Sequence, residues 1–327
     1  MTRLTLSRAL NEGLRKALED NPKALIMGED VGRLGGVFRV TDGLQKDFGE
    51  ARVMDTPLAE SGIVGTAIGL ALRGYRPICE IQFDGFVFPA FDQIVTQLAK
   101  MRYRSRGLLR LPLVIRIPFG GGIGAVEHHS ESPEALFAHT PGLRVISCGG
   151  PADGFTMIQQ AAECDDPVLF FEPKRRYWDR ADVDIEAGLA GALRMDSARV
   201  VVPGTDATVL CYGPMVRTCA EAAVAASADG RSIEVIDLRS LAPLDAETIF
   251  ASVRKTGRCV VVHEAVVTGG IGAEIAARIS QQCFYSLEAP VLRVGAPTTP
   301  YPPSRLEELY LPDLDRILDA VDRTFGY

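Results

Sequence analysis

The sequence predicts an α/β protein made of two units, each with a mainly parallel sheet. Runs typical of buried strands alternate with runs typical of helices, and this alternation lapses once, past the middle of the chain. The length of 327 residues corresponds to roughly two domains at about 150 residues each. With 47% hydrophobic and 24% charged residues, the composition is that of a folded chain and excludes a disordered one or a coiled coil.

The first unit opens with an amphipathic helical pattern, after which short apolar runs ending in polar residues follow at intervals. The predicted strands are residues 24–27, 53–55, 76–81, 113–117, 143–147 and 168–172. The predicted helices are residues 5–20, 60–72, 86–104 and 152–163, with Ser132-Pro133 as a good start for another. The 60–72 helix is rich in glycine, which costs about 1 kcal/mol in a helix interior. We therefore expect it to be deeply buried, with its glycines allowing another backbone to approach closely.

Residues 174–203 interrupt the pattern with a basic triplet, many small residues and a Pro-Gly pair. We place the first domain at 1–186, a linker at 187–203 and a second, smaller domain at 204–327. In the second domain, the predicted strands are residues 207–211, 233–237, 258–262 and 290–294, and the predicted helices are 215–227, 246–255, 272–283 and 313–325. The triplet Lys174-Arg175-Arg176 is expected to lie on a solvated face or to meet an acidic partner.

Charge and cysteine usage exclude several classes of protein. The formal net charge is -7, so no basic face for nucleic acid is implied. The longest uncharged apolar stretch is far shorter than the ~20 residues that span a bilayer, so no membrane span is predicted. The seven cysteines are scattered without metal-ligand spacing, which favours buried thiols in a reducing compartment. With no signal-like apolar core at the N-terminus, we expect a cytoplasmic protein.

Polar groups follow several predicted strands of the first unit at the edge where parallel sheets usually bind ligands. Glu29, Glu60 and Gln82 each come after a different strand, and a glycine-rich loop after a fourth leads to His128-His129. These groups could converge on one site. The competing interpretations are that Glu60 complements a helix dipole and that His129 is a surface or packing residue. Adjacent histidines point in different directions on most backbones, so no metal site is predicted.

Two glycine patterns could suggest other ligands. Gly120-x-Gly122-x-x-Ala125 follows a strand as a dinucleotide fingerprint would. However, Pro133 stops any helix from continuing out of this loop, and no acidic residue stands at the end of the next strand. A nicotinamide oxidoreductase is therefore disfavoured. Gly269-Gly270-x-Gly272 would open a helix, either for close packing or as an amino end that attracts anions.

Five sequence motifs, in the same order as in a known family, give the chain a resemblance to that family. Asp-Thr-Pro-Leu-Ala-Glu-Ser-Gly-Ile-Val-Gly at 55–65 resembles the signature of the beta subunits of thiamine-diphosphate-dependent 2-oxo acid dehydrogenases. The other four similar stretches are 28–31 with 36–39, 80–83 with 88–93, 129–135 with 141–142, and 234–239 with 287–290. The resemblance covers essentially the whole chain, and the ordered set is far more specific than any single motif.

The resemblance implies a pyrimidine-binding domain with a parallel sheet, followed by a smaller transketolase C-terminal-like domain. It also implies an α2β2 heterotetramer with thiamine diphosphate between an alpha and a beta chain. The alpha chain supplies the Mg²⁺ and diphosphate site through a Gly-Asp-Gly motif, which this sequence lacks. The chain is thus expected to hold the aminopyrimidine half of the cofactor and to be inactive alone. The glycine-rich 60–72 helix is the candidate for part of the subunit contact.

The resemblance also assigns roles to single residues. Glu60 corresponds to the carboxyl group that hydrogen-bonds the pyrimidine N1′ and so promotes loss of the thiazolium C2 proton, while Gln82 and Phe86 lie against the ring. His129 corresponds to the histidine implicated in acyl transfer to a lipoyl group, where a proton donor is needed. Glu29 is expected to lie behind the residues that contact the cofactor and to support their positions.

Some relatives hold K⁺ through segments corresponding to residues 111–114 and 161–166. Cys164 stands where certain of those relatives have an acid, so no K⁺ ligand is assigned.

The implied activity is oxidative decarboxylation of a 2-oxo acid with acyl transfer to lipoyl-lysine on an acyltransferase partner. Residues 88–93 and 170–174 look closer to the branched-chain members, which favours acids of the 2-oxoisovalerate type, with pyruvate as the alternative. A non-catalytic scaffold subunit is the remaining alternative, and the combination of Glu60, Gln82, Phe86 and His129 argues against it.

Overall fold

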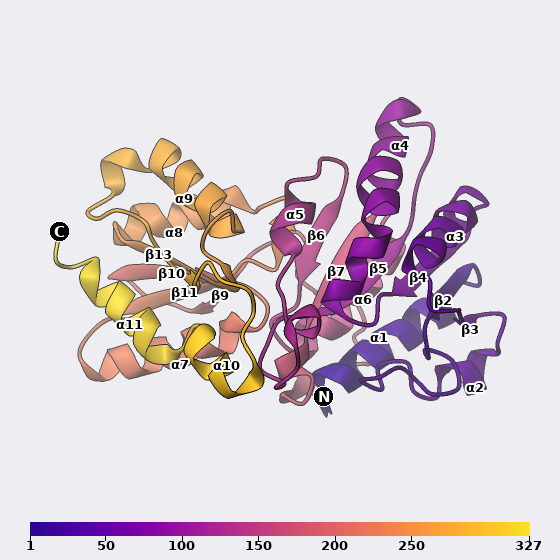
Figure 1. Cartoon of the computed structure of the whole chain (residues 1–327). Helices are drawn as coiled ribbons and strands as arrows, with labels where there is room; N and C mark the ends of the chain where they lie inside the picture. Colours follow the sequence, from indigo (N-terminus) through magenta and orange to yellow (C-terminus); the bar gives the residue numbers. More distant parts are fainter.

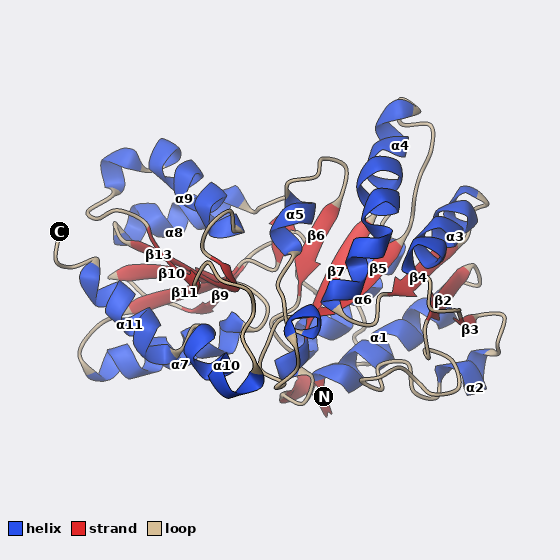
Figure 2. Cartoon of the chain, viewed as in Figure 1, coloured by secondary structure: helices blue, strands red, loops and turns tan.

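Two main sheets organise the chain, and the computed structural model describes all residues from 1 to 327. In spatial order, the first sheet contains β12 (Ser240–Ala242), β6 (Arg144–Ser147), β7 (Val168–Pro173), β5 (Val114–Phe119), β4 (Arg76–Glu80), β2 (Ala24–Gly28) and β3 (Val53–Asp55). The second contains β14 (Leu292–Ala296), β13 (Cys259–Val266), β10 (Ala207–Cys211), β11 (Ile233–Asp237) and β9 (Arg199–Val202). Figure 2 shows the sheets side by side, with helices packed around both.

Neighbouring strands are parallel in both sheets except at one edge of each. The edge strand β12 runs antiparallel to β6, and the edge strand β9 runs antiparallel to β11. Separately, β1 (Thr2–Thr5) pairs antiparallel with β8 (Arg180–Val183), so the N-terminus lies against the end of the first domain. The α/β class with mainly parallel sheets is confirmed.

Helices cover both faces of the first sheet, which explains why its strands are mainly apolar on both faces. In β2, Leu25 and Met27 pack in the core that includes α3 (Glu60–Leu72). Ala24 and Ile26 pack in the opposite core with α1 (Leu6–Asp20) and α6 (Pro151–Glu163). Alternate side chains of a strand point to opposite faces, so a strand covered on both faces has no polar side. Figure 1 shows α3 beside α4 (Ala99–Arg104), away from α1.

The second domain repeats this layering on a smaller scale. Its sheet packs α7 (Met215–Ala228) and α11 (Leu314–Arg323) on one face. On the other face lie α8 (Ala246–Thr256) and α9 (Ile271–Gln282), whose core is continuous with that of the first domain. Asp245 and Asp313 accept backbone N–H groups at the starts of α8 and α11 as N-caps. The short helices are α2 (Leu44–Phe48), α5 (Glu134–Ala138) and α10 (Glu307–Tyr310).

The segment predicted as one helix at 86–104 is helical in three different ways. A 3₁₀ stretch runs from Asp84 to Ala90 around Pro89, a π-helical stretch follows at Gln93–Leu98, and only then does α4 begin. Proline cannot donate a backbone hydrogen bond, which accounts for the irregular start. Periodicity predicted the segment's length but not this change of winding.

The prediction that α3 is deeply buried is wrong for the single chain. Its apolar side, with Ile63 and Val64, packs on the sheet, but Gly65 and Gly69 are exposed. No atom lies within 4 Å of the position a Cβ would take on either glycine. The helix therefore presents an open glycine face, made of Gly62, Gly65 and Gly69.

Two strands cross the predicted division between the domains. Residues 199–202, placed in the linker, form β9 at the edge of the second sheet, where Val202 lies opposite Val235. Residues 240–242, placed in the second domain, form β12 at the edge of the first sheet. Both are short edge strands recruited by long-range pairing, which local patterns do not encode. The boundaries 1–186 and 204–327 stay a prediction.

No helix in the chain has both the length and the apolar character that crossing a bilayer requires.

Candidate active site

The carboxyl ends of four neighbouring strands form one edge of the first sheet. β3, β2, β4 and β5 are adjacent and parallel, so the segments that follow them lie on the same side. The Thr56 N–H donates to the Gly28 carbonyl at 2.9 Å, joining the segments after β3 and β2. Gln82 Nε2, just after β4, lies 3.4 Å from Asp30 Oδ2. The structure thus brings together segments that are far apart in the sequence.

Two buried carboxyl groups, Glu60 and Glu29, lie next to each other at this edge. Glu60 is the first residue of α3 and is only 6% exposed, and Glu29 is 8% exposed. Burial raises the pKa of Glu29, and the negative charge of Glu60, followed by those of Asp30 and Glu80, raises it further. The raised pKa lets the Glu29 carboxyl group keep its proton more readily, so this pair of carboxyl groups is suited to holding a proton at a ligand atom.

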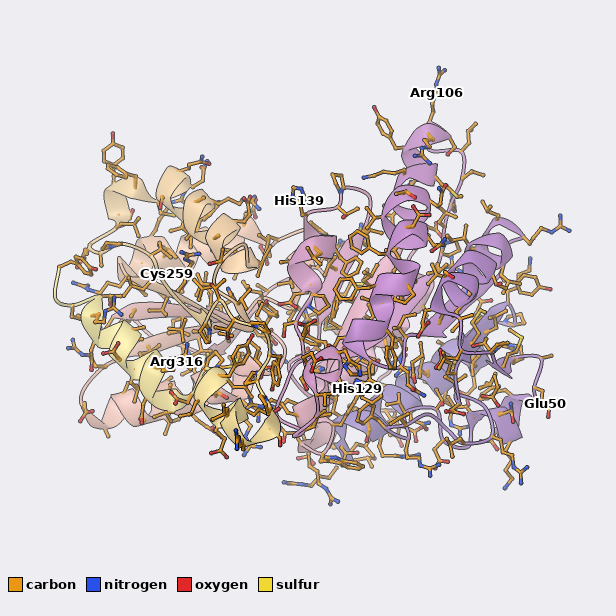
Figure 3. All side chains as sticks on the ribbon, viewed as in Figure 1. Glu50, Arg106, His129, His139, Cys259 and Arg316 are labelled. Carbon is orange, nitrogen blue, oxygen red and sulfur yellow. The ribbon has the colours of Figure 1, made fainter.

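An aromatic group completes this edge. The His129 ring centroid lies 4.0 Å from that of Phe83 and 5.1 Å from that of Phe86, with Phe86 edge-on at 78°. Burial lowers the pKa of His129, and His128 and Lys174 lower it further. Its Nδ1 is buried without a hydrogen-bond partner in the chain. Figure 3 shows His129 near the middle of the molecule. The lowered pKa thus favours the neutral imidazole over the charged one.

A fully buried arginine supports the site from within the sheet. Arg116 on β5 donates to Glu172 on β7 at 2.6 and 2.9 Å, and to Glu80 on β4 at 2.6 Å. The Tyr177 hydroxyl also donates to Glu172, at 2.6 Å. Burial raises the pKa of Glu80, while Arg116 opposes that rise. The cluster ties together three strands whose ends carry site residues.

The glycine loop at 120–124 is occupied by carboxylates of the second domain. The N–H of Gly121 donates to Glu264 at 3.1 Å. The N–H groups of Gly122 and Gly124 donate to the two oxygens of Glu307, at 2.9 and 3.1 Å. The loop is therefore an anion-binding turn of the kind that holds phosphates in other proteins, but here its ligands are the chain's own side chains. This disfavours the dinucleotide alternative further.

The basic triplet is not a solvated face. Lys174 is 1% exposed and pairs with Asp84, and Arg176 is buried against the Pro214 carbonyl. Arg175 pairs with Glu264 at 2.8 Å. The acidic partners lie within the chain, on segments distant in sequence. Sequence reasoning missed Asp84, Lys174, Arg116 and Glu307, because no local pattern marks a charge that will be buried.

Comparisons with known proteins identify the two domains. Residues 2–178 match the transketolase pyrimidine-binding domain, and residues 196–317 match the transketolase C-terminal domain. The chain is 59% identical to a pyruvate dehydrogenase E1 component subunit beta of Leifsonia xyli subsp. xyli, across 99% of this chain and 95% of that protein. It is 52% identical to a 3-methyl-2-oxobutanoate dehydrogenase subunit beta of Mycobacterium tuberculosis, across 98% of this chain and 91% of that protein.

Among solved structures, a split-gene transketolase described as an inactive beta4 tetramer is similar, with a TM-score of 0.81. The similarity covers 99% of this chain and 98% of that one at 24% sequence identity, which shows a shared fold. All of the predicted site residues lie within the part that matches the pyrimidine-binding domain: Glu29, Glu60, Gln82, Phe86 and His129.

Proposed function

The chain belongs to the beta subunits of the 2-oxo acid dehydrogenases, and we propose that, with an alpha subunit, it carries out oxidative decarboxylation of a 2-oxo acid and transfer of the acyl group to lipoyl-lysine. The observation that carries this proposal is the pair of buried carboxyl groups, Glu60 and Glu29, at the carboxyl edge of the sheet. Family membership makes thiamine diphosphate the expected cofactor.

The residues present fit the aminopyrimidine ring of thiamine diphosphate. The ring offers a nitrogen that takes a hydrogen bond from a carboxyl group, and a flat face that suits an aromatic neighbour. Glu60 would hold the proton at N1′, with Glu29 behind it, and Gln82 and Phe86 would fix the orientation of the ring. When bound, the cofactor supplies the carbon nucleophile and accepts the electron pair released with CO2. The contribution of Glu60 is thus to keep a proton at one defined atom.

The single chain supplies only part of a site. Glu60, Gln82 and Phe86 line none of the clefts around Tyr301, Tyr103, His139, Phe250 and Trp178. The open glycine face of α3 begins at Gly62, two residues after Glu60. We propose that an alpha subunit covers this face in an α2β2 heterotetramer and supplies the diphosphate and Mg²⁺ site. Obligate interfaces of this type bury about 2,000–5,000 Å².

We propose that His129 provides the proton that the departing lipoyl sulfur needs. Its half-buried imidazole lies at the rim of the aromatic group, and a histidine can lose and regain a proton near neutral pH. Because its pKa lies below the usual 6.5, the protonated form becomes populated as the pH falls. The acyl-transfer step should therefore accelerate toward lower pH, while decarboxylation need not.

The proposed substrate is a branched-chain 2-oxo acid of the 2-oxoisovalerate type. The segments at 88–93 and 170–174, which look closer to branched-chain members, support this choice. Pyruvate is the second candidate, and the relative named as a pyruvate dehydrogenase subunit at 59% identity favours it. We also propose that the second domain binds the lipoyl-bearing acyltransferase.

The deciding experiment is to coexpress the chain with its alpha subunit and to test a panel of 2-oxo acids with thiamine diphosphate and Mg²⁺. We expect no turnover by the chain alone and decarboxylation by the assembly. Glu60→Gln should lower turnover by roughly 10²–10⁴-fold, the scale of acid–base assistance. Near-normal turnover in that variant would rule out the role of Glu60. Cofactor binding by the assembly that does not respond to the same change would favour a scaffold.

A further inference from the structure

A buried ion pair, Asp84 and Lys174, lies directly behind His129. The side chains of both residues are fully buried, and Lys174 Nζ contacts Asp84 Oδ1. Asp84 begins the 3₁₀ stretch after β4, and Lys174 follows the last residue of β7. The pair thus comes from two strands of the same sheet and does not belong to the carboxyl pair of Glu60 and Glu29.

Each member of the pair holds the backbone on one side of Ser130. Lys174 Nζ donates to the carbonyl oxygen of His129 at 2.5 Å. Asp84 Oδ2 accepts the N–H of Glu131 at 2.8 Å. A Cβ on Gly85 would collide with the His128 carbonyl, so the turn after Asp84 lies directly against this loop. The two charges therefore fix the peptide groups that determine where the His129 imidazole points.

The same pair reaches the imidazole through an aromatic ring. Lys174 Nζ lies 5.4 Å from the centroid of Phe83, the residue before Asp84, and the His129 ring lies 4.0 Å from that centroid. The ammonium, the phenyl ring and the imidazole form one packed column. Movement of Lys174 would therefore release both the backbone of His129 and the ring on which it rests.

The other end of the loop is tied to the second domain. The Gly120 N–H donates to the Glu131 carbonyl at 2.9 Å, and Glu307 binds the N–H groups of Gly122 and Gly124. Because the loop is anchored at both ends, the ion pair at the centre of residues 127–131 determines how these residues are oriented.

Fold stability alone is a weak explanation for such a pair. Burial lowers the pKa of Lys174 and raises that of Asp84, so each charged form is opposed by desolvation and sustained by the other. Buried ion pairs replaced by apolar residues of similar size often leave a protein as stable or more stable. A charged pair whose remaining hydrogen bonds all go to one loop is better explained by the geometry of that loop.

We propose that the Asp84–Lys174 pair positions His129 for acyl transfer, by holding the backbone on both sides of Ser130 so that the imidazole stays packed against Phe83 and Phe86. Neither residue is a catalytic residue, since both act through His129. The proposal rests on the proposed function, because it is the role of His129 there that makes its orientation matter.

The test uses the assembled α2β2 protein with three variants of this chain. Lys174→Met removes the donor to His129, and Asp84→Asn/Lys174→Met also avoids a lone buried charge, so that folding is preserved. Lys255→Met is the control, because Lys255 forms an ion pair with Glu234 in the second domain, away from His129. Two rates are measured: lipoyl acylation and decarboxylation with an artificial oxidant.

We expect both Lys174 variants to lose about 10–100-fold in lipoyl acylation, the range that small misplacements cause. The artificial-oxidant rate should change by less than about threefold, and the control should leave both rates unchanged. In a His129→Ala background the Lys174 change should cause no additional loss of acylation. Equal loss in both rates, or a full further loss in the His129→Ala background, would overturn the proposal, since a purely structural defect would produce either result.

A second measurement separates this proposal from the proposed function. The chain has four histidines, so the His129 imidazole signal can be assigned in a selectively labelled chain by comparison with His129→Ala. In the double variant this signal should move or broaden, while that of His263, buried in the second domain, stays unchanged. An unmoved His129 signal would overturn the positioning role, whatever the activity of the assembly. An assembly that decarboxylates no 2-oxo acid would instead refute the proposed function.

Discussion

Replacing Arg116 with methionine should destabilise the first domain by about 3–5 kcal/mol. The arginine is fully buried, and three of its N–H groups donate to Glu172 and Glu80 at 2.6 to 2.9 Å. Methionine fills similar space without a charge, so two buried carboxylates lose their only shared cation. A loss of about 3–5 kcal/mol is typical when a buried charge is left without its partner, whereas the loss of the hydrogen bonds alone would cost less.

The loss should depend on pH in a defined direction. Burial already raises the pKa of Glu80, and without Arg116 nothing opposes that rise. At pH values above the ordinary pKa of glutamate, Glu80 therefore stays protonated in the folded variant but loses its proton in the unfolded chain. The free energy of unfolding of the variant falls as the pH rises. The difference in unfolding free energy from the unchanged protein should therefore be larger at about pH 8 than at about pH 5.5.

The assay is urea unfolding followed through the fluorescence of Trp178, the only tryptophan. Trp178 follows Tyr177, whose hydroxyl donates to Glu172, so it reports on the part of the first domain that contains the cluster. Arg110→Met is the control, since Arg110 is exposed and its pair with Asp165 should contribute less than about 1 kcal/mol. A loss below about 1 kcal/mol for Arg116→Met, or one that does not vary with pH, would refute the reasoning.

Four further outcomes follow from the site and its surroundings. His129→Ala should reduce lipoyl acylation more than decarboxylation with an artificial oxidant, and equal losses in the two assays would count against acyl transfer as its role. Gly65→Ala should stabilise the single chain by up to about 1 kcal/mol in thermal unfolding, because α3 gains helix propensity and nothing lies where the Cβ would go. Gly65→Phe should leave the chain folded but weaken its association with an alpha subunit in gel filtration, and unimpaired assembly would exclude this face as the contact. Glu307→Gln should cost about 1–3 kcal/mol in thermal unfolding, since the amide NH2 group of glutamine cannot accept the hydrogen bonds that one of the two carboxylate oxygens accepts from a loop N–H group.

Much of the fold was accessible from local patterns. The strands at 53–55, 207–211 and 233–237 and the helix at 60–72 have the predicted limits. Apolar runs bounded by turn residues encode such elements directly, and a shared carboxyl edge follows from parallel order. Glu29, Glu60 and Gln82 could therefore be assigned to one edge before any coordinates, although their individual roles came from resemblance and stay a proposal.

Features that depend on pairing across the chain were not accessible in this way. β9 and β12 are short strands that exist because a partner edge was available, and β12 joins the sheet of the other domain. Lys174 gives the clearest case, since a lysine followed by two arginines is ordinarily solvated. It is buried here because Asp84, 90 residues earlier, reaches the same point in space.

Short-range patterning was thus enough to establish the α/β class, most element limits and the edge where ligands would bind, because these follow from the alternation of apolar and polar residues along the chain. The folded chain alone revealed which charges are buried, which carboxylates fill the glycine loop and what holds His129. Those outcomes depend on the desolvation of paired groups, and that pairing arises only when distant segments are packed together.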